Sequence, residues 1–281
     1  MKEKSPRFLL PDEVSQFDAL GFVVRRGLLS MPEINAVISE LESVCAELIG
    51  HHPVSGDVVW ESPFVERNNV LTNLVADDHI YLSVGDLLGD NMLWLGSEGM
   101  WGFDDSLANH DWHADGGWIK DQIEPYYLKV MIYLDPLRRD NGALRIIPGS
   151  HRSLLHESLL PFSEASSPGG SCQYFGQRGI DVPSHAIETN PGDVVFFNNW
   201  LFHAVYGKVH PRRAIIIKFV SMPRNDNHRA LLRRSSSVRT ANNLLLSHDN
   251  KRIRALAERL PSFTGTEPAE CYSGRDQAAT L

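Results

Sequence analysis

Six short segments rich in β-forming residues, spread from about residue 91 to residue 222, constrain the fold of this 281-residue chain most strongly. They read NMLWLG, YYLKVMIYLD, ALRIIPGS, DVVFFNN, WLFHAVY and RAIIIKFVSM, and Gly, Pro, Asn and Asp bound them. Many short strands that follow a helical region favour an antiparallel β-architecture. The pattern predicts a sandwich or a closed double-sheet roll with helices packed outside it.

Helix signals dominate the chain before these segments. A short helix is expected to end at Gly21, and a strand should begin at Phe22. Ser30 is a candidate N-cap for a longer helix, whose apolar residues recur at helical spacing until Gly50. A further helix is expected over about 76–89. The early part of the chain therefore supplies helices that can cover the β-structure.

We expect one domain over residues 1–281, since 42% of the residues are hydrophobic and can fill a sizeable core. A helical part covers about 1–90, a β-core about 91–222, and a polar extension with one or two helices about 223–281. The segment 161–179 is typical of a long loop, and such loops often act as lids.

Charge and cysteine content exclude several classes of function. The formal net charge of −8 argues against binding to a nucleic-acid backbone, and no apolar run is long enough to cross a membrane. The N-terminal MKEKSPRFLL lacks the apolar stretch of a secretory signal. Three widely spaced cysteines form no disulfide or zinc pattern. We expect a cytoplasmic protein that binds a small molecule, and its oligomeric state is left open.

The stretch HDWHADGGW, residues 110–118, carries the strongest chemical signal. Residues two apart on a strand point to the same side, so His113 and Asp115 can bind one metal ion together. The best third ligand is His203, which follows the β-rich PGDVVFFNNWLF. Two histidines and one carboxylate form the facial triad of non-haem Fe(II) oxygenases, although zinc accepts the same ligands.

Such a triad leaves coordination positions for a 2-oxo acid and O₂, and an arginine is expected to anchor the far carboxylate of that acid. Arg212 and Arg213 both open the strand RAIIIKF, and they point to opposite faces. Spacing alone does not choose between them. Lys129 and Lys218 are lone cations in apolar strands, and each either meets an anionic group or extends to solvent.

The chain resembles the phytanoyl-CoA dioxygenase family of Fe(II)/2-oxoglutarate-dependent oxygenases over about residues 10–222. The resemblance rests on four motifs in order, GFVVRRGLLSMPEI, DWHAD, YLDPLRRDNGALRIIPGSHR, and PGDVVFFNNWLFHAV followed by PRRAIIIKF. It implies a mainly β fold with flanking helices, whose core is a double-stranded β-helix, the jelly roll of cupin-like proteins. The NGAL and PGSH segments are expected to form turns rather than to take part in chemistry.

The resemblance also implies roles for individual residues. His113, Asp115 and His203 bind iron, Arg212 is favoured over Arg213 as the anchor of 2-oxoglutarate, and Lys129 lies near the co-substrate or the substrate. The segment HAVYGKVHPRR lacks the serine and asparagine common in the family and is about two residues shorter. Asp115 is present, whereas related halogenases have a small residue there, so hydroxylation or desaturation of a C–H bond is expected, with release of succinate and CO₂.

Other residues of the motif receive less specific predictions. His110 is expected to support the site from the opposite face of a regular strand, and Trp118 and Trp101 are candidates for contact with the substrate. Two alternatives are a jelly-roll protein that binds a ligand without turnover, and a zinc or manganese hydrolase or isomerase of cupin type. The identity of the substrate is not predicted.

Overall fold

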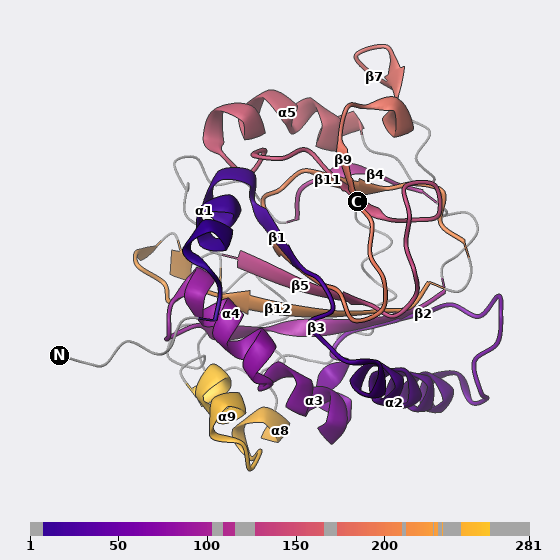
Figure 1. Ribbon diagram of the computed structural model, residues 1–281, viewed down its shortest axis with the longest axis vertical. Coiled ribbons are helices and arrows are strands. Elements are labelled where there is room, and N and C mark those ends of the chain that lie inside the picture. Colours follow the sequence, from indigo (N-terminus) through magenta and orange to yellow (C-terminus); the bar gives the residue numbers. More distant parts are fainter. Residues whose placement is uncertain are drawn as a thin grey trace.

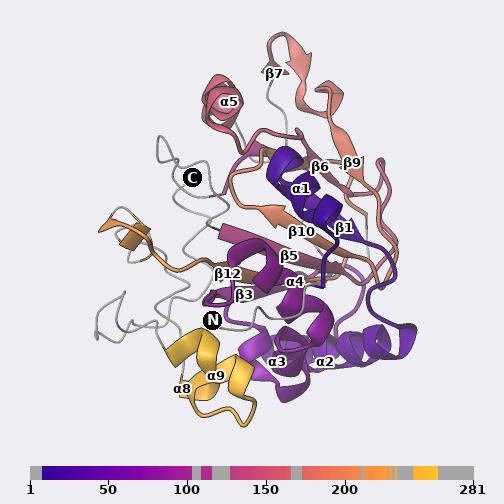
Figure 2. The ribbon, with the colours of Figure 1, turned by 60° about the vertical axis from the view of Figure 1, so that its left-hand side comes forward.

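Two antiparallel β-sheets face each other and carry helices on their outer sides (Figures 1 and 2). The computed structural model of the protein describes residues 8–102, 109–115, 127–165, 173–209, 212–226, 228–229, 232 and 243–258. Within these residues the expected double-sheet roll with external helices is present.

The larger sheet has six strands, and the first and last of them come from the early part of the chain. In order across the sheet they are β1 (Phe22–Arg25), β10 (Val194–Asn198), β5 (Tyr127–Tyr133), β12 (Ala214–Val220), β3 (Leu93–Trp101) and β2 (Val59–Glu61). The predicted strand at Phe22 thus forms one edge of the sheet. Strands that precede residue 90 therefore extend the β-structure beyond the six predicted segments.

The smaller sheet has four short strands. In order they are β4 (His110–His113), β11 (His203–Val205), β6 (Leu144–Ile146) and β9 (His185–Ile187). A separate hairpin of β7 (Gln173–Tyr174) and β8 (Gln177–Arg178) projects beyond this sheet (Figure 2).

Helix α5 (Ser153–Ala165) covers the outer side of the smaller sheet, and it corrects the expectation of a loop over 161–179. The helix continues through Pro161 because Leu159 and Phe162 are buried in a cluster with residues of β4 and β11. This packing outweighs the helix-breaking tendency of proline. Of the predicted loop, residues 166–172 lie outside the described residues.

The remaining helices lie mainly below the larger sheet (Figure 1). They are α1 (Pro11–Leu20), α2 (Met31–Ile49), α3 (Asn69–Val75), α4 (Asp78–Leu88), α8 (Asn243–Leu246) and α9 (Lys251–Glu258), with 3₁₀ turns η1 (Val65–Arg67) and η3 (Gly179–Asp181). Ser30 caps α2 as predicted, because its side-chain oxygen accepts from the Glu33 N–H while its own N–H donates to the Glu33 carboxylate at 2.7 Å. Helix α3 was not predicted. Among the described residues, none of the helices is long and apolar enough to span a membrane.

The two faces of the larger sheet pack against different partners. Outward residues such as Ile215, Ile217 and Phe219 join the core beneath the helices. Inward residues such as Ala214 and Ile216 pack between the two sheets. This alternation along β12 places every second residue inside the roll.

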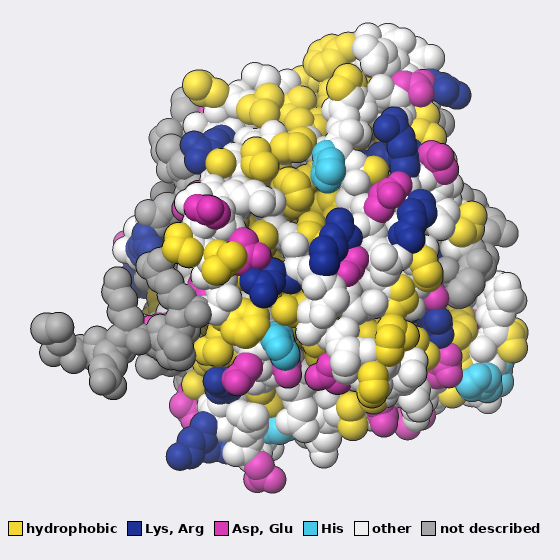
Figure 3. All heavy atoms as spheres, in the orientation of Figure 1, with side chains coloured by type: hydrophobic (Ala, Val, Ile, Leu, Met, Phe, Trp, Pro, Cys, Tyr) yellow, Lys and Arg dark blue, Asp and Glu magenta, His cyan; other side chains and the backbone are white. Residues whose placement is uncertain are grey.

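Acidic and basic side chains are interspersed on the molecular face drawn in Figure 3. Dark blue and magenta atoms alternate there with apolar and neutral ones, so this face carries no continuous basic surface of the kind that binds a phosphate backbone.

Candidate metal centre inside the roll

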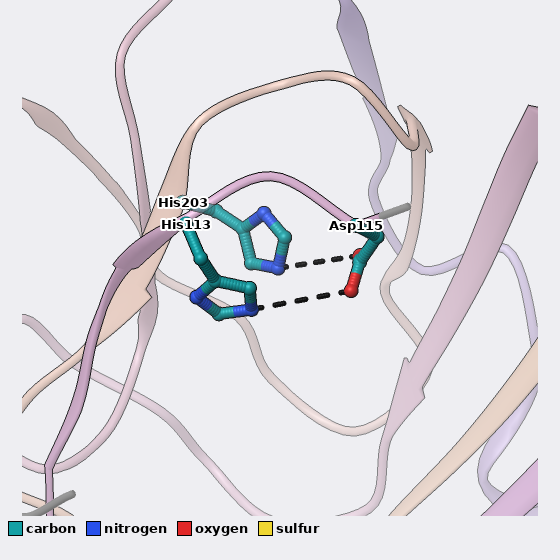
Figure 4. Close-up of side chains that lie close together, drawn as sticks. All are labelled: His113, Asp115 and His203. Atoms are coloured by element: carbon teal, nitrogen blue, oxygen red, sulfur yellow. Dashed lines mark ion pairs between the residues drawn. The ribbon is translucent and has the colours of Figure 1, made fainter. Parts of the chain in front are cut away.

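His113, Asp115 and His203 converge between the two sheets (Figure 4). One ligand atom from each residue lies within 4.8 Å of the other two. His113 ends β4 and is directly paired with His203 at the start of β11, while Asp115 follows β4 by two residues. The Nε2 atoms of His113 and His203 lie 3.9 and 3.4 Å from oxygens of the Asp115 carboxylate. The sequence prediction that these three residues share one place is confirmed.

Backbone carbonyl groups orient both imidazole rings. His113 Nδ1 donates to the carbonyl of Asp111 at 2.7 Å, and His203 Nδ1 donates to the carbonyl of Leu201 at 2.8 Å. With the proton on Nδ1, each Nε2 keeps a lone pair directed toward Asp115. Burial lowers the pKa of His203 to about 3, so this ring is neutral near pH 7. The Nδ1 contacts with backbone carbonyls thus leave the Nε2 atoms of both rings facing the Asp115 carboxylate.

Asp115 is held in position by its backbone. Its N–H donates to the carbonyl of Asn199 at 3.0 Å, and the Asn199 side-chain amide donates back to the Asp115 carbonyl at 2.7 Å. Asn199 follows β10, so the two sheets are linked here beside the site. The sequence alone offered no reason to assign Asn199 this role.

The Asp115 carboxylate fits a metal ion. Burial alone would raise its pKa, but Lys129 and the two histidines outweigh burial and hold the pKa well below its usual range. Lys129 Nζ lies 2.6 Å from Oδ2, and a carboxylate oxygen has more acceptor sites than one ammonium group fills. An ionised, buried oxygen with remaining acceptor capacity, next to two Nε2 lone pairs, matches the donor set of a facial triad.

A β-bulge in β4 changes the position expected for His110. Val205 pairs with His110 while His203 pairs with His113, so three steps along β4 match two along β11. The extra residue brings His110 to the same side as His113, and the two rings stack with centroids 4.3 Å apart. The expectation that His110 lies on the opposite face is therefore wrong. Its contact with His113 agrees with a supporting role.

The two neighbouring arginines have different surroundings. Arg213 pairs with Asp135 at 2.7 Å and Glu42 at 3.1 Å, and its guanidinium lies over the Trp101 ring. Arg212 is 3% exposed, and no described carboxylate pairs with it. Its Nε donates to the Gly142 carbonyl at 3.3 Å, and its guanidinium carbon lies 5.4 Å from the centroid of the Tyr133 ring.

Gly142 makes room for Arg212 as well as forming the predicted turn. Its φ is 101°, and a Cβ atom there would lie 3.2 Å from Arg212 Nε. Burial lowers the pKa of Arg212, but a guanidinium stays charged at neutral pH. The roll thus contains a buried cation whose surroundings leave it able to bind an anion.

The two lysines in apolar strands both point inward. Lys129 pairs with Asp115, and Lys218 forms an ion pair with Glu98 on β3. Burial alone would lower the pKa of Lys129, but Asp115 and Glu98 outweigh burial and raise it. Glu98 was missed in the sequence, although a lone carboxylate in the apolar run LWLGSEGMW is itself an unusual signal.

The two tryptophans predicted to contact the substrate are not placed together at the metal site. Trp101 lies on the outer face of β3, beneath Arg213 and in the core on the helical side, so the structure does not bring it together with the metal-site residues. Trp118 lies outside the described residues.

Comparison with known proteins gives one family. Residues 17–208 match the family model described as phytanoyl-CoA dioxygenase (PhyH). A Caenorhabditis elegans protein described as a probable phytanoyl-CoA dioxygenase is 22% identical over 213 residues, which cover 66% of this chain and 67% of that protein.

Solved structures agree with the predicted fold. HygX from Streptomyces hygroscopicus, solved with nickel and 2-oxoglutarate, aligns with a TM-score of 0.58 and 18% identity, covering 76% of this chain and 88% of HygX. EctD from S. alaskensis with bound Fe also has a TM-score of 0.58, with 19% identity and coverage of 78% and 79%. The predicted family, the jelly-roll fold and the oxygenase class are confirmed.

Proposed function

Because the chain belongs to the phytanoyl-CoA dioxygenase family of Fe(II)/2-oxoglutarate-dependent enzymes, we propose that it hydroxylates an unactivated C–H bond of a small organic molecule. The substrate, 2-oxoglutarate and O₂ would yield the hydroxylated product, succinate and CO₂. One oxygen atom of O₂ enters the succinate carboxylate and the other enters the C–H bond, while the oxygens of CO₂ come from the carboxylate of 2-oxoglutarate next to its keto group. The alternative outcome is desaturation, in which two hydrogens leave adjacent carbons and the second oxygen atom of O₂ leaves as water.

In this proposal His113, Asp115 and His203 hold the iron, and Arg212 binds the distal carboxylate of 2-oxoglutarate. The observation that carries the proposal is the convergence of two Nε2 atoms and one carboxylate inside the same roll as a buried guanidinium, which pairs with no carboxylate among the described residues. Bound iron would supply the oxidising chemistry, which side chains alone lack. Lys129 contributes positive charge beside Asp115, where the carboxylate of 2-oxoglutarate next to its keto group would bind.

The choice of Arg212 rests on charge and burial. A guanidinium binds a carboxylate through two parallel hydrogen bonds, and a buried one gains most from such a partner. Arg213 already has Asp135 and Glu42, so a dicarboxylate would have to displace both. The missing serine and asparagine after His203 do not affect this contact, since Arg212 is positioned by Gly142 and Tyr133.

Formation of succinate tests the proposal. The protein is incubated with Fe(II), 2-oxoglutarate, ascorbate and a library of small substrates, and succinate and oxidised product are measured by mass spectrometry. His113→Ala should lower iron affinity by more than the 10- to 100-fold that loss of an outer-shell partner costs. The exposed His51→Ala variant serves as the matched control. Gain of one oxygen indicates hydroxylation, and loss of two hydrogens indicates desaturation.

Two results would contradict the proposal. One is the absence of succinate with every substrate, including uncoupled turnover without substrate. The other is a protein that binds zinc or manganese and gives no absorption band with Fe(II) and 2-oxoglutarate under anaerobic conditions. The second result would favour a hydrolase or isomerase, and full iron binding by His113→Ala would refute the ligand assignment.

A further inference from the structure

Two lysines lie directly opposite each other on the inner face of the larger sheet. Lys129 on β5 pairs in register with Lys218 on β12, and the side chains are only 13% and 14% exposed. Like charges at directly opposed positions destabilise a sheet, and burial of charge adds to that cost. Packing alone therefore does not explain why both positions are lysine.

Each lysine has a carboxylate of its own. Lys129 pairs with Asp115, and Lys218 pairs with Glu98, whose side chain is 13% exposed. Burial would raise the pKa of Glu98, but Lys218 and Lys129 outweigh it and keep the carboxyl ionised. The four side chains thus form a buried group with two positive and two negative charges.

This group lies at the opposite end of β12 from Arg212. Lys218 follows Arg212 by six residues (218 − 212) on the same face, which corresponds to about 20 Å of extended strand. Asp115 contacts Lys129, so the metal-site residues lie toward the lysine end. A co-substrate that extends from Arg212 to the metal would leave Lys218 and Glu98 unused.

Charge balance identifies what Lys218 and Glu98 could bind, on the premise of the proposed function. Arg212, Lys129 and Lys218 carry three positive charges, and Asp115 and Glu98 carry two negative ones. Fe(II) and the 2-oxoglutarate dianion add no net charge. The two carboxylates of 2-oxoglutarate would compensate Arg212 and, together with Asp115, the iron. One positive charge then remains at the lysine end.

We infer that Lys218, held by Glu98 beside Lys129, binds a carboxylate of the substrate next to the metal centre. A single carboxylate completes the charge balance of these five side chains with Fe(II) and 2-oxoglutarate, whereas an ammonium group would add to the excess. The substrate is then a small organic acid, and Lys218 and Glu98 determine the specificity for its carboxylate.

Matched probes of one size test this assignment. The protein is loaded with Fe(II) and 2-oxoglutarate without O₂, and hexanoate, hexanamide and hexylammonium are titrated in by calorimetry. Hexanoate should bind at least about tenfold more tightly than hexanamide, which corresponds to about 1.4 kcal/mol. The absorption band of the Fe(II)–2-oxoglutarate complex is followed in parallel, because a probe that displaces 2-oxoglutarate would abolish it.

Substitutions of the two partners should act in opposite directions. Lys218→Met should weaken hexanoate binding about tenfold and leave hexanamide binding unchanged. Glu98→Gln should strengthen hexanoate binding several-fold, because it removes the competing anion. The exposed Lys251→Met and Glu258→Gln on α9 are matched controls. If Lys218→Met does not fold, the double variant Glu98→Gln/Lys218→Met leaves no unpaired charge and should lose the preference for hexanoate.

The outcomes separate the two proposals. Equal affinity for hexanoate and hexanamide, no binding of hexanoate, or a shift of hexanoate affinity in the same direction in both single variants would overturn the role of Lys218. The proposed function would survive those results as long as the absorption band forms. Absence of the band in the unmodified protein would instead contradict the proposed function.

Discussion

The two faces of the larger sheet are built from the same strands but have different roles, since one face packs in the core and the other carries the charged residues of the site. On β12, Ile215, Ile217 and Phe219 face a continuous apolar core beneath the helices. Their immediate neighbours on the inner face include Lys218, and Arg212 precedes the strand on that side. Residues that stabilise the core and residues that belong to the site are thus adjacent in the sequence of β12 and point to opposite faces. Substitutions on the outer face should change the free energy of unfolding, and those on the inner face should change ligand binding.

The largest effect is expected from a cavity on the outer face. Ile217 is fully buried in the core on the helical side, so Ile217→Ala should destabilise the protein by about 2–5 kcal/mol. Denaturant unfolding of the metal-free protein measures this loss, and Ile217→Val should cost only about 0.5–1.5 kcal/mol. The Kd for 2-oxoglutarate of the folded fraction should not change. A large rise in that Kd would show that the two faces are not independent.

Substitutions of Arg212 and Arg213, which precede β12, test whether the two faces of the sheet have separate roles. Arg212→Met should raise the Kd of 2-oxoglutarate about 100-fold, since it removes a buried charged partner worth about 2–5 kcal/mol. Arg213→Met should leave that Kd unchanged and lower stability, because Asp135 and Glu42 lose their partner. Calorimetric titration of both variants provides the measurement. The reverse result would assign the anchor to Arg213.

A buried histidine next to α1 gives a prediction for the pH dependence of stability. His151 is 3% exposed, and burial lowers its pKa to about 4 despite its hydrogen bond to the Asp18 carbonyl. The unfolded chain binds this proton near pH 6.5, so between pH 6.5 and 4 it holds more protons than the folded protein. Stability should therefore fall by about 2 kcal/mol from pH 6.5 to 4.5 because of this group.

Unfolding free energies of the metal-free protein across that range check the prediction. In His151→Gln the decrease on acidification should be smaller by about the same amount. An unchanged pH dependence would show that His151 is not held neutral by burial.

The smallest effect is expected at Trp101. Its ring lies beneath Arg213 on the outer face, so Trp101→Phe should cost roughly 1 kcal/mol of stability through the weaker cation–π contact. The KM for the substrate should stay unchanged, as measured by succinate formation at varied substrate concentration. A several-fold change in KM would restore Trp101 as a substrate contact.

Local sequence patterns predicted much of the fold. The Ser30 cap, the apolar spacing and Gly50 defined α2, and the β-rich runs marked β3, β5, β6, β10, β11 and β12. Helix α3 escaped because its seven residues are too few for a clear period, and the Asn68 cap is what marks its start. Helix α5 was not predicted, and its last turn runs into the segment expected to be a loop because burial of Phe162 outweighs the local preference of Pro161.

The sequence predicted those site residues that a short spacing in the chain identifies. It did not predict those whose role depends on a charged partner far away in the sequence. The H-x-D spacing and a histidine distant in the sequence predicted the three metal-site residues. The choice between Arg212 and Arg213 required knowing that Asp135 and Glu42 neutralise one of them. Glu98 was missed because its importance comes from Lys218 on a strand 120 residues away. Long-range pairing of charges leaves no local signature.

The bulge in β4 has a consequence for how related chains can diverge. The extra residue turns both Asp111 and Trp112 outward, where the Asp111 carboxylate accepts from Tyr206 and Trp112 donates to the Gly179 carbonyl. Deleting one of these two residues would restore a regular strand and turn His110 away from His113, although H-x-D would still read correctly in an alignment. Insertions and deletions of a single residue just before the motif are therefore more damaging than substitutions there, and a one-residue gap at that place would mark a relative with an altered centre.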